Sequence, residues 1–575
     1  MRKLLPVLLG LALITVIGAQ AAAAPPPKPK VGSDVRVSGG PYVRHDGGSD
    51  AVIASCNSSD PATGGTLERE NEPFAIVDPT NPNVVVSGWN DYCSNWEGLG
   101  FSNDGGVSWV STPVPGYPAD NSVEGALSPL KGRADDAGDP IAAFDRTGRL
   151  FVGGISFMDS GAPTNGDMWV SRWGANAAGP LPKDYLGMVI VGQGTPSRNF
   201  LGQFNDKPML EVDRTGGAND GNVYVCWSRF VSNGQNKIFF SRSTDHGVTF
   251  SAPVSISGNH SVQGCDIAVE SDGDVFVTWR ALDDNAAITS PGIAFARSSD
   301  GGASFGNVGR VVDIIRYNPF DGARDCGDGV DACATGYVFA RIPLEPRVTA
   351  DPTGKLPGVF VVYNAVDPAT VVPSTSSYSS AGGGRVGQSK VYIVRSTNDG
   401  ASWSAPVAVS NNAVGHQFFP DADVLDGKLA VMWQDSRSDP AYSVQRPIGN
   451  TAAATSSGTD VVRSYLATST TGTSFGSAVQ VSRTGMQPEY EMFDARSVPF
   501  IGDYNWIQLV KRADGSLFGF TAWTDNRDVV PGTDPRETVQ DGFDVLMCLD
   551  ANLVNTCPNA GGFNQNIYGN WLTIG

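Results

Sequence analysis

A short phrase recurs along this chain of 575 residues and constrains its fold more than any other feature. The first copy, residues 102–109, reads Ser-Asn-Asp-Gly-Gly-Val-Ser-Trp. Later copies begin at Ser243, Ser298, Ser396 and Thr468. The fourth copy has Asn398 in place of Asp, and the fifth has lost the acid. A local unit that returns in this way predicts a repeat architecture in which each unit packs against its neighbours.

The chemistry of the phrase suits a tight turn between two strands. A short polar side chain can fold back onto backbone N–H groups, and glycine accepts the left-handed φ that such a turn needs. The closing aromatic residue is then expected to pack beneath the turn. We therefore expect a structural role for the phrase and no catalytic one.

The phrase resembles the Asp-box of sialidases and other sialidase-like β-propellers. Each copy belongs to a longer unit whose first strand opens at a recognisable pair of residues. The seven openings are Glu72-Pro73, Asp139-Pro140, Lys207-Pro208, Cys265-Asp266, Glu345-Pro346, Pro420-Asp421 and Asp503-Tyr504. With 69 Gly and 38 Pro the chain is predicted to be all-β, a β-propeller of four-stranded blades. Seven blades are favoured; six blades plus an insertion are the alternative, because sialidases have six.

The ends of the chain fit a closed ring. The segment Asp34–Ser38 is similar to the outer strands that follow the repeated turns, such as Ala252–Ser257 and Ala405–Ser410. We expect it to be donated to the last blade, which would remove a free sheet edge. The predicted organisation is a signal peptide at residues 1–24, a linker at 25–33 and one propeller domain at 34–575.

Several features predict export from the cell. Arg2 and Lys3 precede an apolar stretch and a small-residue cleavage site, as in secretory signals. A secreted location, extracellular or periplasmic, is therefore expected. Eight cysteines in such a protein suggest disulfides. The plausible pairs are Cys56–Cys93, Cys226–Cys265, Cys326–Cys333 and Cys548–Cys557.

The charge balance excludes some partners. The formal net charge is −19 with 40 Lys and Arg, whereas nucleic acids and anionic membranes require clustered cations. The sequence has no second apolar stretch long enough to span a membrane, so membrane insertion is not expected. A monomer is expected. The four His have no metal-ligand spacing. No cofactor is predicted to be required, and structural Ca²⁺ in the channel is kept as an alternative.

Strand register indicates which face of the ring carries function. The repeated turns join third and fourth strands on one face. The starts of the inner strands and the ends of the second strands then meet on the opposite face, around the channel. Functional residues are expected there, on loops held by a rigid scaffold.

Four segments on that face resemble sialidase segments. The resemblance implies Tyr504 as the nucleophile, Asp266 as its activating carboxylate and Asp91 as the acid/base. It also implies that Arg280 and Arg463 hold the carboxylate of the sugar. A carboxylate beside a tyrosine makes chemical sense, because a phenol of pKa ~10 is a poor nucleophile at neutral pH.

Two departures from the family pattern stand beside this. The first inner strand lacks the family's Arg-Ile-Pro motif, and the copy at Arg341-Ile-Pro343 falls before the fifth unit, where we interpret it as coincidental. The strand openings also carry seven acids: Glu72, Asp139, Asp206, Asp266, Glu345, Asp421 and Asp503. Such a ring would repel an anionic sugar and suit a neutral sugar, an amine or Ca²⁺.

Other candidates have a structural interpretation as well. Asp435 with Arg437, and Asp525 with Arg527, repeat as Trp-x-Asp-x-Arg and would bind ligand or fix loops through ion pairs. Glu72, Asp139 and Glu345 are substrate-binding candidates. Tryptophans that recur at one strand position would stack on sugars or fill the wedge between blades. The leading hypothesis is a secreted sialidase-like glycoside hydrolase acting on glycans; the rival is a non-catalytic propeller that binds glycans or proteins at the cell surface.

Overall fold

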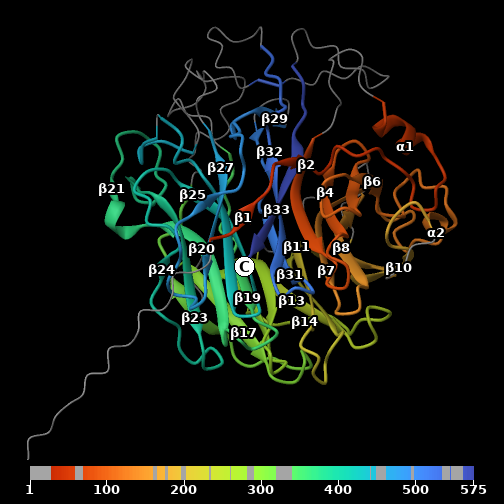
Figure 1. Ribbon diagram of the computed structural model, residues 1–575, viewed down its shortest axis with the longest axis horizontal. Coiled ribbons are helices and arrows are strands. Elements are labelled where there is room, and N and C mark those ends of the chain that lie inside the picture. Colours follow the sequence, from red (N-terminus) through yellow and green to blue (C-terminus); the bar gives the residue numbers. More distant parts are fainter. Residues whose placement is uncertain are drawn as a thin grey trace, which may run out of the picture.

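The protein is a ring of seven β-sheets, which confirms the predicted seven-bladed propeller and excludes six blades with an insertion (Figure 1). The computed structural model describes residues 28–575 except 59–68, 159–164, 175–178, 196–201, 232–234, 259–260, 282–290, 319–339, 441, 449–460, 494–497, 534–543 and 546–560. The predicted signal peptide therefore lies outside the described residues. Among the described helices, none is long and apolar enough to cross a membrane.

The blades follow one another along the chain. Blade 1 is β3 (Glu70–Val77), β4 (Val85–Asp91), β5 (Trp96–Ser102) and β6 (Val110–Pro113). Blade 2 is β7 (Asp136–Phe144), β8 (Leu150–Phe157), β9 (Asp167–Trp173) and β10 (Tyr185–Gly192). Blade 3 is β11 (Phe204–Val212), β12 (Val223–Val231), β13 (Gln235–Ser243) and β14 (Val254–Ser255). Blade 4 is β15 (Val262–Val269), β16 (Val275–Ala281), β17 (Gly292–Ser298) and β18 (Gly309–Asp313).

The remaining blades carry the additions to the ring. Blade 5 is β19 (Arg347–Ala350), β20 (Val359–Val366), β23 (Ser389–Ser396) and β24 (Val407–Ala408), interrupted by η3 (Pro368–Thr370) and the pair β21 (Val372–Pro373) and β22 (Arg385–Val386). Blade 6 is β25 (Gln417–Leu425), β26 (Lys428–Asp435), β27 (Arg463–Ser469) and β28 (Val479–Gln480). Blade 7 is β31 (Trp506–Lys511), β32 (Leu517–Asp525) and β33 (Asn566–Ile574). Elements outside the blades are α1 (Ala51–Cys56), α2 (Val123–Ala126) and the pair β29 (Glu491–Phe493) and β30 (Val498–Pro499).

The N-terminal arm closes the ring, as the sequence predicted. β2 (Val35–Arg36) pairs antiparallel with β33, and Val37 donates its N–H to the carbonyl of Ile567 at 2.8 Å. Figure 1 shows these red strands beside the blue β33. β1 (Lys30–Val31) pairs with the same strand, so the arm extends into residues that the sequence assigned to a linker.

The repeated turns have the predicted hydrogen bonds. In the first copy the Asp104 carboxylate accepts from the backbone N–H and the hydroxyl of Ser108, and Ser102 Oγ accepts from Gly106. The fifth copy differs from the predicted alignment, because Ser469 and Thr471 play the parts of the Ser and the Asp. We call these five segments the box turns.

Buried tryptophans fill the wedges between blades. Trp89, Trp227, Trp279, Trp433 and Trp523 are at most 1% exposed, so they are unable to stack on a sugar at the surface. The structure supports the wedge role for all of them.

Two of the four predicted disulfides lie in described parts of the chain, and both are formed. Cys56–Cys93 joins α1 to the loop after β4. Cys226–Cys265 joins the second strand of blade 3 to the inner strand of blade 4. The cysteines of the other two pairs, Cys326–Cys333 and Cys548–Cys557, lie outside the described residues.

Candidate functional site

A pocket of about 630 Å³ opens around the channel on the face opposite the box turns. It is formed by the starts of inner strands, by the ends of second strands and by the segments that flank blades 4, 5 and 7. This is the face that the strand register predicted. Its lining is unusually rich in charge, with carboxylates from blades 1, 2, 3 and 7 and guanidinium groups from blade 4 and the segments around it.

Local backbone geometry turns three of these side chains toward one point. Glu72, Asp139 and Lys207 occupy equivalent positions in blades 1, 2 and 3, each inside a β-bulge and each before a proline. Their φ values are 56°, 56° and 50°, in the left-handed region that most side chains avoid. Strain of about 1–3 kcal/mol at such positions persists only where the surroundings enforce it, and it is common at functional sites.

Lys207 lies at the centre of the carboxylates. Its Nζ is 3.2 Å from Glu72, 3.4 Å from Asp139 and 2.5 Å from Asp503. Its backbone N–H also donates to Asp139 at 3.1 Å. Three of the strand-opening acids that the sequence predicted therefore share one cation, Lys207, which was not among the predicted site residues.

The carboxyl groups differ in their protonation. Burial raises the pKa of Glu72 well above its usual range, and Lys207 only partly opposes this. Burial also disfavours the charge of Asp139, but Lys207 and a hydrogen bond from Glu72 outweigh it and lower the pKa of Asp139. The pKa of Asp503 is lowered in spite of burial, because Arg341 and Lys207 both bind it. One acid of this group is therefore protonated beside two that are ionised.

Asp206 is the acid of the pocket that titrates near neutrality. Burial, followed by the nearby charge of Asp139, raises the pKa of Asp206 to about 7. Gln263 of blade 4 donates from Nε2 to its Oδ2 at 2.8 Å and fixes its orientation. A carboxyl group that is half protonated at neutral pH beside an ionised neighbour is a typical general acid/base arrangement.

Three arginines form the opposite wall of the pocket. Arg280 is the penultimate residue of β16, Arg316 follows β18 and Arg341 precedes β19. Arg341 binds both oxygens of Asp503 at 2.9 and 2.5 Å, yet its side chain remains 42% exposed. Burial, and then the charge of Arg280, lowers the pKa of Arg316, and the Nε atoms of both residues have no hydrogen-bond partner among the described residues.

The structure does not bring Tyr504 and Asp266 together. Tyr504 is 3% exposed, its hydroxyl has no hydrogen-bond partner in the described part of the chain, and burial raises its pKa far above the usual value. Asp266 accepts instead from the backbone N–H groups of Ile267 and Val348, at 2.9 and 2.7 Å. Each residue lies two positions beyond a left-handed glycine, Gly502 or Gly264, and therefore below the pocket.

Asp91 lies in the pocket wall but is engaged locally. Its Oδ1 accepts from the backbone N–H of Cys93 at 2.9 Å, and its Oδ2 accepts from the Ser94 hydroxyl at 2.6 Å. Its side chain closes the turn after β4. Of the other predicted residues, Glu72, Asp139 and Arg280 line the pocket with it.

The remaining predicted site residues lie elsewhere. Arg463 donates to the carbonyl of Arg483 at 2.6 Å and does not line the pocket. Glu345 is buried beneath the pocket beside Tyr504. The pairs Asp435–Arg437 and Asp525–Arg527 form ion pairs of 2.5 and 2.6 Å, each bonded as well to the indole N–H of the preceding tryptophan, so they fix loops.

Sequence reasoning missed Lys207, Arg316 and Arg341 as site residues. For Arg341 a signal was present, because the Arg-Ile-Pro sequence interpreted as coincidental supplies an arginine to the pocket. For Lys207 the signal was its place before Pro208, where blades 1 and 2 carry Glu72 and Asp139. Nothing in the sequence around Arg316 marked it.

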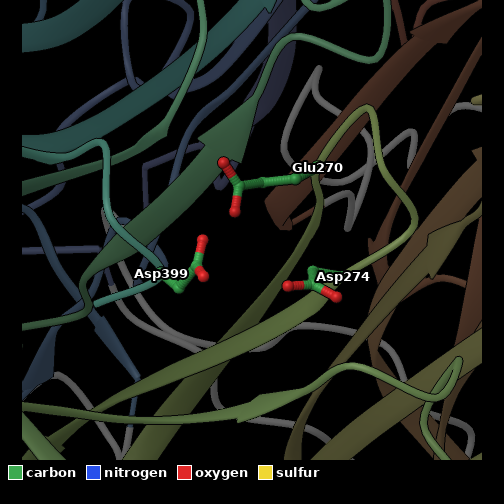
Figure 2. A group of neighbouring side chains, drawn as sticks. All are labelled: Glu270, Asp274 and Asp399. Atoms are coloured by element: carbon green, nitrogen blue, oxygen red, sulfur yellow. The ribbon is translucent and has the colours of Figure 1, made fainter. Parts of the chain in front are cut away.

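A second acidic group lies on the box-turn face. The carboxylates of Glu270, Asp274 and Asp399 point toward one another between blades 4 and 5 (Figure 2). Arg297 pairs with Asp274 and, at 3.2 Å, with Asp399. A guanidinium group thus already balances part of the charge that Ca²⁺ would require.

No protein-family model and no curated protein matches this chain. Solved structures with some likeness include a protein of unknown function from Dyadobacter fermentans, at 12% identity and TM-score 0.36, covering 70% of this chain and 95% of that one. They include the Hadza microbial sialidase Hz136, at 11% identity and TM-score 0.37, with 77% of this chain and 71% of that one covered. They also include the GH93 α-L-arabinofuranosidase of Fusarium graminearum, at 13% identity and TM-score 0.38, with 70% of this chain and 92% of that one covered. With such identities the activity has to be argued from the site itself.

Proposed function

We propose that this protein is a glycoside hydrolase whose active site is the central pocket. The observation that carries the proposal is the divergence of its carboxyl pKa values around Lys207. Burial and the charge of Asp139 raise that of Asp206 to about 7, while Asp139 and Asp503 stay ionised. Two carboxyl groups whose pKa values differ in this way are what glycosidic bond cleavage requires.

Asp206 is assigned as the proton donor. It lines the pocket, it is held by Gln263, and near neutral pH it retains a proton that it can give to a leaving oxygen. Asp139 is the ionised partner: it takes a proton from the water that attacks the anomeric carbon, while Asp206 gives its proton to the departing oxygen. Both roles use residues of blades 2 and 3 rather than Tyr504.

The wall of arginines favours an acidic sugar as substrate. Like charges in a buried wall repel one another, and an anionic ligand relieves that repulsion. Arg280 and Arg316 each keep an unpartnered Nε, and Arg341 is accessible from the pocket. A sugar carboxylate matches the forked geometry of guanidinium groups. Lys207 offsets part of the negative charge with which the strand-opening acids would repel such a sugar.

The test is turnover by wild type and Asp206→Asn on a panel of aryl glycosides and glycans with and without a carboxylate. We expect cleavage of an acidic member and a loss of about 10²- to 10⁴-fold in kcat for Asp206→Asn, the range that general acid catalysis contributes. The matched control is Asp272→Asn, which changes an exposed residue in the turn between β15 and β16. This variant is expected to behave as wild type. Equal turnover by Asp206→Asn and wild type would remove the assignment.

A non-catalytic glycan-binding propeller is the second candidate. It is favoured by one observation, the absence of a hydrogen bond between Tyr504 and Asp266, which leaves the family's nucleophile pair unassembled. In that case wild type binds an acidic glycan without cleaving it, and Asp206→Asn binds with the same affinity. Calorimetric titration of both variants distinguishes the two candidates.

A further inference from the structure

Lys207 is the cation among the residues that open the inner strands of blades 1 to 3. Its counterparts, Glu72 in blade 1 and Asp139 in blade 2, share its left-handed backbone and its following proline. A lysine at this position reverses the charge of the repeat. It also reaches across the channel mouth to Asp503, which precedes blade 7, near the other end of the chain.

The contacts of Lys207 account for all three of its ammonium protons. A lysine ammonium has three donors and no acceptor, and Nζ lies within 3.4 Å of three carboxylates, those of Glu72, Asp139 and Asp503. Its side chain is only 12% exposed, so water screens these contacts weakly. Beneath it lies the ring of Tyr504, whose centroid is 5.9 Å from Nζ.

Other charged groups face the same cluster from neighbouring elements. Asp503 is shared with Arg341, and the charge of Glu345 from blade 5 bears on Asp206. Arg347 lies 5.1 Å from the Tyr504 ring centroid on the side of blade 5. Arg280 of blade 4 reaches Gln263, the partner of Asp206. Lys207 touches three carboxyl groups at once, so its removal changes the charge of the cluster most.

We propose that Lys207 is a positioning residue that keeps Asp139 and Asp503 ionised and thereby assigns the exchangeable proton of the site to Asp206. This inference rests on the proposed function for its catalytic meaning. Its electrostatic content stands on the contacts alone. The positive charge of Lys207 also favours the ionised form of Asp206, which holds that proton close to the point of release at neutral pH.

The test replaces the ammonium with an apolar chain of similar length. Infrared spectra report protonated carboxyl groups through their C=O stretch, and they need no substrate. Spectra are recorded against pH for wild type, Lys207→Met, and each of these combined with Asp206→Asn. The Asp206→Asn spectra report the remaining acids, among them Asp139 and Asp503, and subtracting them from the spectra with Asp206 isolates the band of Asp206. Lys131→Met, at an exposed lysine of the loop after α2, is the matched control.

We expect the midpoint of the carboxyl band that remains in the Asp206→Asn background, to which Asp139 and Asp503 contribute, to rise by about 1 to 3 pH units when Lys207→Met is added, because these two acids lose the cation that contacts them. Lys131→Met should leave it where it is in wild type. An unchanged midpoint in Lys207→Met would overturn the role of Lys207, whether or not any glycoside is cleaved.

The outcomes separate this inference from the proposed function. A shifted midpoint without turnover on any glycan supports the electrostatic role of Lys207 and removes the hydrolase. Turnover with an unshifted midpoint supports the hydrolase and contradicts the proposed role of Lys207. If Lys207→Met fails to fold, Lys207→Gln is titrated instead, because its amide can still donate to Asp503 without the charge.

Discussion

The hydroxyl of Tyr504 lies in a buried layer just below the central pocket, with no partner among the described residues. Its ring, by contrast, is well placed. The guanidinium of Arg347 and the ammonium of Lys207 lie 5.1 and 5.9 Å from the ring centroid. These distances fit cation–π contacts, for which the aromatic face matters and the hydroxyl does not.

Tyr504→Phe is therefore expected to be tolerated. A buried hydroxyl without a hydrogen bond destabilises the folded state by about 1–3 kcal/mol, and phenylalanine removes that penalty while keeping the ring. The free energy of unfolding, measured by urea denaturation, should stay equal or rise, and turnover should be unchanged. A large loss of turnover in a fully folded Tyr504→Phe would restore this tyrosine as the nucleophile.

Single residues were the hardest scale to predict. The sequence placed Glu72, Asp139 and Arg280 on the correct face, and they line the pocket. It also offered Tyr504 and Asp266 by resemblance. Both lie two positions beyond a left-handed glycine, and that offset decides whether a side chain enters the pocket or bonds a neighbouring strand. Residue type alone does not reveal such an offset, because it depends on the bulge at each strand start.

At the scale of elements, the N-terminal arm shows how a short segment can hold a large ring. Asp34 follows β1, and its carboxylate binds Arg527 at 2.8 Å. It also accepts from the backbone N–H groups of Arg483 and Thr484 and from the side chain of Asn570. One side chain thus connects the arm to blade 7 and to the segment that follows blade 6.

Asp34→Ala should weaken the closure of the ring. The carboxylate is 6% exposed and its loss leaves Arg527 without one of its two acids, so we expect the free energy of unfolding to fall by about 2–4 kcal/mol. Equilibrium urea denaturation measures it, with Asp272→Ala as the control. Identical curves for Asp34→Ala and wild type would mean that strand pairing alone closes the ring.

The order of elements was predicted well because it rests on repetition. Five box turns and seven strand openings favoured seven blades over six, and the likeness of Asp34–Ser38 to outer strands predicted the closure; the structure confirms both. The additions to blade 5, β21 and β22, carry no repeat and gave no signal. Lys207 and Arg341 each stood in a recognisable motif, but their meeting at Asp503 gave no signal, because the three residues are far apart in the chain and meet only when the ring closes.

At the scale of the whole molecule, several carboxyl groups around the channel are buried and have raised pKa values. Burial raises the pKa of Asp266 to about 6 and that of Asp421 to about 7, and both bind backbone N–H groups of the neighbouring blade. On the box-turn face, burial and the nearby acids raise the pKa of Glu270 to about 7. In an unfolded chain such groups titrate near 4.

The sign of the resulting pH dependence follows from linkage. Between about pH 4 and 7 the folded protein binds more protons at these groups than the unfolded chain does, so their stabilising contribution is lost as pH rises through the folded pKa values. His416 has the opposite effect: burial lowers its pKa to about 4, so its contribution to stability increases as pH rises. It is one group against several acids.

We therefore expect the melting temperature to fall by several degrees between pH 5 and pH 8. Calorimetry at constant ionic strength measures it. Asp421→Asn, which keeps an acceptor for the N–H of Ile507 and removes the titration, should flatten the slope. A melting temperature that rises steadily from pH 5 to pH 8 would contradict this distribution of buried acids.

The central claim is that Asp206 donates the proton in a central pocket whose charges are arranged by the closed ring. The most direct measurement is the pH profile of kcat/KM on a glycan that the protein cleaves, for wild type and Asp206→Asn. The predicted wild-type rate falls as pH rises through about 7, where Asp206 loses its proton, and this limb is absent from the low residual rate of Asp206→Asn. An alkaline limb that persists unchanged in Asp206→Asn would contradict the account.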